Sequence, residues 1–264
     1  MSRAEVEGLT PGELRRVITD GRWSESTEGL APGRLQANIV VIPEEDALDF
    51  ARFCLANPKP CPVLEITEAG APILRRVAPG ADLRSALPRY RVFVDGALIE
   101  EPADVTDHWE EDAVGFVLGC SVTFESALLR EGVPLRHLEE GRKVSSYLSD
   151  IKCEPAGRFE GCLVVSMRPI PAPLVVKAVE ITARYPHSHG APVHISDPAT
   201  IGITDLQNVL WGAPPVMRPG DVPVFWAGGS TPQMALAAAR PRYAITHKPG
   251  HMLVCDLTAE LAVP

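Results

Sequence analysis

Proline is the feature that most constrains how this chain can fold. Its 264 residues include 26 prolines, about twice the usual share of roughly 5%. The proline ring clashes inside a helix and removes a hydrogen-bond donor from a central strand. The sequence therefore predicts a fold with many fixed loops, and rigid loops are good positions for a functional site.

Apolar runs between these loops predict an α/β fold. Residues 39–42 and 63–67 resemble buried strands, and the acidic residues after Pro43 open a helix between them. This order predicts a βαβ unit in a parallel sheet, and residues 163–196 suggest a second one. The other predicted elements are a capped helix at 10–21, a hairpin at 90–99, helices at 105–118, 124–130 and 233–240, and strands at 222–226, 243–247 and 253–257.

Charge and composition exclude several classes of function. The formal net charge is -9 and no basic block is present, which argues against a nucleic-acid partner. No apolar run approaches the ~18 residues of a membrane helix. The six cysteines are scattered without a C-x-x-C pair, so we expect a reduced, cytoplasmic protein. The sequence has no P-loop, G-x-G-x-x-G or G-x-S-x-G motif, and it leaves a homo-oligomer open.

A loop rich in glycine and hydroxyl residues follows the strand predicted at 222–226. It runs Gly228-Gly229-Ser230-Thr231-Pro232-Gln233. Two glycines allow the backbone to approach a ligand, and the next helix offers free N–H groups to a carboxylate. We predict that Gly228, Gly229, Ser230, Thr231 and Gln233 bind substrate, and the alternative is a plain strand-to-helix turn.

Two histidine-containing segments also follow or flank predicted strands. His189 and His194 lie close to Asp197, and His247 and His251 lie in a turn that Pro249 and Gly250 keep from being helical. Histidine transfers protons near neutral pH. We predict catalytic roles for His189, His194 and His251 and substrate binding by Asp197 and His247.

Two further sets complete the candidate residues. Cys120 and Ser121 precede a predicted helix, where a thiol pKa is lowered and anions bind. We predict that both are catalytic, although Cys120 also fits a packed small residue. Arg142 and Arg168 suit a carboxylate clamp, while a single arginine also fits a surface salt bridge.

Short polar blocks follow one another in a fixed order along nearly the whole chain. They are 36–38, 57–62, 82–84, 88–90, 119–121, 139–142, 158–161, 164–169, 189–194, 231–233 and 246–252. Each block alone is weakly specific. Their joint order resembles that of the D-glutamate cyclase / putative hydro-lyase family.

The resemblance implies a fold and a reaction. The fold is an α/β architecture, with a three-layer α/β/α domain and a second, smaller two-layer α/β domain. We assign residues 1–135 and 220–264 to the main domain and 136–219 to the smaller one. A related animal member converts D-glutamate to 5-oxo-D-proline plus water, whereas the bacterial members are named hydro-lyases of unknown substrate.

Loss of water from a small carboxylic or amino acid is therefore the expected reaction. Arg168 or Arg142 would hold a carboxylate, the 228–233 loop would bind the other carboxyl, and a histidine would move protons. The expected partner is a small carboxylate substrate, with no required cofactor. Two alternatives stay open: a metal-assisted lyase or hydrolase that uses His189, His194 and Asp197 with a divalent metal, and a non-catalytic binder of small acids.

Overall fold

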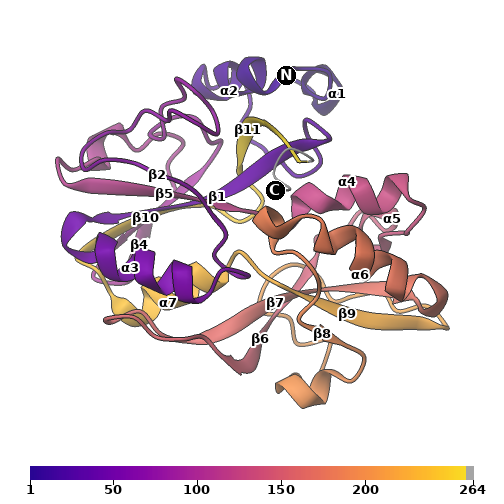
Figure 1. Ribbon diagram of the computed structural model, residues 1–264. Coiled ribbons are helices and arrows are strands. Elements are labelled where there is room, and N and C mark those ends of the chain that lie inside the picture. Colours follow the sequence, from indigo (N-terminus) through magenta and orange to yellow (C-terminus); the bar gives the residue numbers. More distant parts are fainter. Residues whose placement is uncertain (260–264) are drawn as a thin grey trace.

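Two antiparallel sheets organise the chain. A computed structural model describes residues 1–259, and Figure 1 shows helices both between and outside the two sheets. The predicted α/β class is confirmed. The predicted parallel sheet is wrong, because every pairing among the described strands is antiparallel.

The larger sheet has seven strands. They run in the order β2-β5-β1-β10-β3-β4, and β11 also pairs with β1. Because β5 lies between β1 and β2 and is antiparallel to both, β1 and β2 run in the same direction without pairing, and α3 joins them across β5. The bounds are β1 Arg34–Pro43, β2 Val63–Ile66, β3 Tyr90–Val94, β4 Ala97–Glu100, β5 Ala113–Gly119, β10 Tyr243–His247 and β11 Leu253–Thr258.

The smaller sheet has four strands in the order β6-β7-β9-β8. Their bounds are β6 Ser145–Lys152, β7 Cys162–Pro171, β8 His194–Ile195 and β9 Asp221–Ala227. Residues 221–227 therefore pair with the sheet of the smaller unit, although we assigned them to the main domain by sequence. The division into two domains stays a prediction. Residues 260–264, which we assigned to the main domain, lie outside the described residues.

Seven α-helices are described, and none of them is long and apolar enough to span a membrane. The helix predicted at 10–21 is confirmed with its capping box, in which Glu13 N donates to Thr10 Oγ1. The bounds are α1 Arg3–Val6, α2 Pro11–Thr19, α3 Glu44–Ala56, α4 Val122–Arg130, α5 Arg136–Glu139, α6 Val175–Ala183 and α7 Thr231–Ala239. The 3₁₀ helices are η1 Thr106–His108, η2 Ala172–Leu174, η3 Pro186–Ser188 and η4 Pro198–Ile201.

The main apolar core joins the two sheets. One buried cluster contains Val40 of β1, Phe50 of α3, Val165 of β7, Phe225 of β9 and Leu236 of α7. In Figure 1, α3 and α7 lie between the sheets, as this cluster requires. The opposite face of β9 packs on α4 and α6 through Val224 and Trp226. Burial of both faces therefore holds the sheets in one relative position.

The largest local error concerns residues 105–118, where we predicted a helix. The structure has η1 followed by β5, and every residue of β5 is buried. A strand buried on both faces shows no alternation of polar and apolar residues, so its apolar run is easily mistaken for helix. Strand β6 also escaped prediction, because its apolar residues are mixed with three serines, Asp150 and Lys152.

Candidate active site

A cavity of about 100 Å³, here called the inter-sheet cavity, lies where the ends of the two sheets meet. The larger sheet contributes Asn38 and His247, and the smaller sheet contributes Ser146 and Ser166. The cavity is also lined by Glu28, Cys120, Ser121, Val122, Lys143, Val144, Trp211, Gly212, Gly229, Ser230, Pro249, Gly250 and Met252. Three of the loops singled out by sequence thus meet at one place.

Close backbone approaches bring these loops together. Asn38 Nδ2 donates to Gly119 O at 2.9 Å. A Cβ added to Gly229 would lie 2.0 Å from the same Asn38 nitrogen, so a larger residue there would displace the Asn38 amide. Asn38 therefore links the end of β5 to the loop between β9 and α7.

A buried ion pair stands behind Ser121. Arg168, fully buried, donates from Nη2 to Ser121 Oγ at 3.3 Å and to Glu125 Oε1 at 2.5 Å. Its guanidinium also stacks on Phe124 and Trp226, 4.9 and 5.5 Å from the ring centroids. Because Ser121 Oγ accepts from Arg168, its own proton is free to be donated to a ligand oxygen.

The charge of Glu125 is held by its neighbours. Burial alone would raise the pKa of Glu125, but Arg168 and a contact from His137 Nε2 at 3.2 Å lower it to about 2. Arg168 is therefore committed to an internal carboxylate instead of a substrate, and it acts on the cavity through Ser121. One of its nitrogens, Nη1, has no hydrogen-bond partner within residues 1–259.

His247 presents a neutral imidazole to the cavity. Ile39 N donates to His247 Nδ1 at 3.3 Å, which leaves the ring proton on Nε2. Burial lowers the pKa of His247 to about 4. At neutral pH this side chain is therefore a hydrogen-bond donor, which suits a carboxyl oxygen that gains negative charge.

Burial favours the protonated form of the Cys120 thiol. Burial raises its pKa to about 11, which is opposite to the lowering that we expected from its place before a helix. Desolvation of a thiolate outweighs the helix dipole here because Cys120 is only 9% exposed.

The structure does not bring His189, His194 and Asp197 to this cavity. Buried His189 has φ 76° and its Nδ1 lies 2.7 Å from Lys59 O. Burial lowers its pKa to about 4. His194 lies on the edge strand β8, where its Nε2 is 2.7 Å from Asp197 O. Asp197 caps η4. Within the described chain, no three His, Cys, Asp or Glu side chains are grouped so as to hold a metal ion.

The remaining predicted residues lie around the cavity or elsewhere. Thr231 Oγ1 bonds Val164 of β7, while Gly228 N donates to Val164 O, so both fix the loop. Gln233 lines a separate pocket beside Phe93. Half-buried His251 turns its Nδ1 to Pro249 O at 3.1 Å, and exposed Arg142 donates to Pro214 O.

Five polar residues at the cavity were missed as candidates by sequence reasoning: Glu28, Asn38, Lys143, Ser146 and Ser166. Asn38 and Ser166 lie inside blocks that carry the family resemblance, and Lys143 comes one residue after such a block. Those blocks were the available signal. Glu28 has none, since it is one acidic residue in a loop.

Comparison with known proteins decides the family. The family model described as D-glutamate cyclase matches residues 114–256, and this segment contains most of the cavity. The chain belongs to the D-glutamate cyclase family. Three relatives named "Putative hydro-lyase" extend the likeness to nearly the full length.

These relatives come from three different organisms. The protein of Thermoanaerobacter sp. (strain X514) is 50% identical, with 98% of both chains covered. That of Geobacillus kaustophilus is 52% identical, with 96% of both covered. That of Rubrobacter xylanophilus is 54% identical, with 92% of this chain and 94% of the relative covered. A nitrogen repressor-like protein of Methanococcus jannaschii gives a TM-score of only 0.41 at 15% identity, with 95% of this chain and 99% of that chain covered.

Proposed function

We propose that this protein removes water from a small carboxylic or amino acid in the inter-sheet cavity, and that D-glutamate, converted to 5-oxo-D-proline, is the first substrate to test. The observation that carries the proposal is the meeting of Ser121, Ser230 and His247 with Lys143 at one small cavity. Membership of the D-glutamate cyclase family supports the same reaction class.

One charged side chain of the cavity is suited to binding an acid. Lys143 lines the cavity, and no carboxylate lies within 4 Å of its ammonium in the described chain. Its charge is therefore available to a substrate carboxylate. The Ser121 hydroxyl, polarised by Arg168 behind it, adds a directed donor.

Ring closure of glutamate needs a folded substrate and a donor at the carbonyl that is attacked. Holding amine and carboxyl together supplies orientation, which is a large part of the barrier in a ring closure. The Nε2–H of His247 can stabilise the oxygen that becomes negative during attack. We therefore assign Lys143 to carboxylate binding and His247 to the reacting carboxyl group.

Direct turnover tests the proposal. The purified protein is incubated with D-glutamate, L-glutamate and a panel of small hydroxy and amino acids, and mass spectrometry follows loss of water. We expect at least one of them to be dehydrated, and Lys143→Met to raise its KM at least tenfold. Lys152→Met, an exposed lysine on β6, is the matched control and should match wild type. Binding of these acids without turnover of any would instead identify a small-acid-binding protein.

A further inference from the structure

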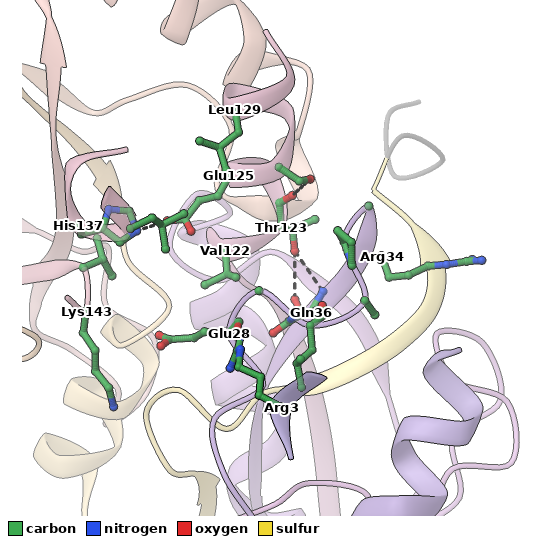
Figure 2. A pocket seen from close by; sticks show the side chains of 18 of the residues that line it. Arg3, Glu28, Arg34, Gln36, Val122, Thr123, Glu125, Leu129, His137 and Lys143 are labelled. Carbon is green, nitrogen blue, oxygen red and sulfur yellow. Dashed lines mark hydrogen bonds and ion pairs between the residues drawn. The ribbon is translucent and has the colours of Figure 1, made fainter. Parts of the chain in front are cut away.

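Glu28 lines two neighbouring cavities. Besides the inter-sheet cavity, a second one of about 210 Å³ lies along α4, here called the α4 cavity. Glu28 and Lys143 are the two charged residues that line both. Figure 2 shows the Glu28 side chain extending toward the side where Lys143 and His137 lie. A carboxyl in this position can be reached from either cavity.

The carboxyl of Glu28 is not committed to an internal partner. Its contact is with Ser26 Oγ at 3.3 Å, and that hydroxyl also donates to Gly250 O at the shorter distance of 2.8 Å. In residues 1–259 no cationic nitrogen lies within 4 Å of it. Gly250 closes over it, because a Cβ there would lie 3.6 Å from Glu28 Cδ. Glu28 thus differs from Glu125, whose charge Arg168 neutralises.

The surroundings of Glu28 favour proton exchange. Burial raises its pKa, and the negative charge of Glu125 acts in the same direction. Lys143, the hydrogen bond from Ser26 and His137 oppose this rise. The titratable and charged groups that face it or its backbone are Arg3, Cys120, Glu125, His137 and Lys143.

We infer that Glu28 is a catalytic proton carrier for the dehydration, moving protons from the substrate amine to the oxygen that leaves. The inference rests on the proposed function and deepens it. It replaces the histidines for which sequence reasoning predicted catalytic roles, because His189, His194 and His251 do not line the cavity. His247, which was predicted to bind substrate, is neutral and already a donor. A carboxyl whose pKa is raised can both accept and return a proton during turnover.

The bonds and protons of this reaction balance without a cofactor. In the cyclisation of glutamate, a nitrogen–carbon bond forms and a carbon–oxygen bond breaks. Two protons leave the ammonium nitrogen, and both end on the departing oxygen as water. Glu28 as carboxylate takes the first proton, which frees the amine for attack, and gives it to the γ-carboxyl oxygen. It then carries the second proton to the leaving hydroxyl and returns to its starting form.

Glu28→Gln tests this role, because glutamine keeps the size but cannot carry the proton. The matched control is Glu25→Gln, an exposed carboxyl in the same loop. Turnover of D-glutamate, or of whichever panel acid the wild type dehydrates, is measured from pH 5 to 9. Binding of glutarate, a dicarboxylate without an amine, is measured by calorimetry, and thermal unfolding checks the fold.

We expect Glu28→Gln to lower kcat at least 100-fold, to bind glutarate within threefold of wild type, and to unfold at no lower temperature. The decline of wild-type kcat toward low pH should disappear in its residual activity. Glu28→Asp, which keeps a carboxyl on a shorter arm, should lower kcat at least tenfold and serves as the second variant if glutamine impairs folding.

Three results would overturn the inference. Turnover by Glu28→Gln within threefold of wild type would overturn the inference and leave the proposed function intact. Loss of glutarate binding together with turnover would make Glu28 a binding group. No turnover of any panel acid by wild type would remove the proposed function itself, and the inference with it.

Discussion

The buried charge of Arg168 has two roles: it pairs with Glu125 inside the fold, and it polarises Ser121 at the cavity. Arg168 was predicted to clamp a substrate carboxylate, yet its guanidinium is fully buried against Glu125. Its contribution to the cavity passes through Ser121. Burial of such a charge is strongly unfavourable unless its counter-charge is buried beside it.

Removal of the Glu125 charge should therefore destabilise the protein strongly. We expect Glu125→Gln to lower the free energy of unfolding by about 3–5 kcal/mol, because it leaves a buried guanidinium unpaired. Glu131→Gln, which changes a carboxylate that is 53% exposed just after the same helix, should change it by less than about 0.5 kcal/mol. Urea unfolding at pH 7 measures both, and equal stability of the two variants would contradict the assignment.

The same pair fixes the sign of a pH dependence. The folded pKa of Glu125 is about 2, below its ordinary 4.5. A carboxyl with a lowered folded pKa stabilises the fold above its unfolded pKa, and this contribution is lost as the pH falls through 2. The difference in stability between wild type and Glu125→Gln should therefore shrink as the pH falls from 4.5 toward 2. A difference that stayed constant over that range would refute this origin.

At the scale of elements, the site depends on how closely β5 approaches η3. A Cβ on Gly119 would lie 1.7 Å from His187 O, far inside the contact distance. Gly119→Ala should displace the end of β5, which carries Cys120 and Ser121. We expect a loss of roughly 1–3 kcal/mol of stability and at least a tenfold loss of turnover.

A substitution at a second glycine, one with free space around it, serves as the control for the loss of backbone flexibility. Gly8, in the turn between α1 and α2, has no atom within 4 Å of a Cβ added there. Gly8→Ala should keep wild-type turnover and thermal midpoint. If Gly119→Ala behaved in the same way, the close approach would not govern the site.

Elements with local signals were predictable, and elements set by tertiary contacts were not. The hairpin of β3 and β4 followed from Asp95-Gly96, whose φ values of 50° and 81° match a turn that favours these residues. Strand–helix–strand order, in contrast, does not say which strands become neighbours. The strand inserted between β1 and β2 is β5, which begins at Ala113, whereas β2 ends at Ile66, and no local pattern encodes this pairing.

The candidate site divides in the same way. Ser121, Ser230 and His247 lie beside small or turn-forming residues at strand ends, so their loops could be selected from the sequence. Glu28 and Lys143 are single charged residues in loops, and their meeting depends on how the 248–251 turn and the start of β6 pack. His189 lies in a segment whose residue types suggest a site, whereas its side chain is buried and does not line the cavity.

At the scale of the whole molecule, the cavity exists only while the two sheets keep their relative position. Its lining comes from both, and the cluster that joins them includes Phe50 of α3 and Phe225 of β9. A core shared in this way couples the stability of one sheet to that of the other. The two domains proposed from the sequence should therefore unfold as one cooperative unit, despite a size at which intermediates are common.

Hydrogen exchange in increasing urea tests this coupling. Amides of β1 in the larger sheet and β7 in the smaller sheet should approach the same free energy of global opening. Phe225→Ala, which empties a fully buried position of the shared cluster, should lower both values equally, by about 3–5 kcal/mol. Lowering for β7 alone would mean that the sheets unfold independently. The cavity between them would then be a junction that opens without global unfolding, and substrate could enter by separation of the sheets.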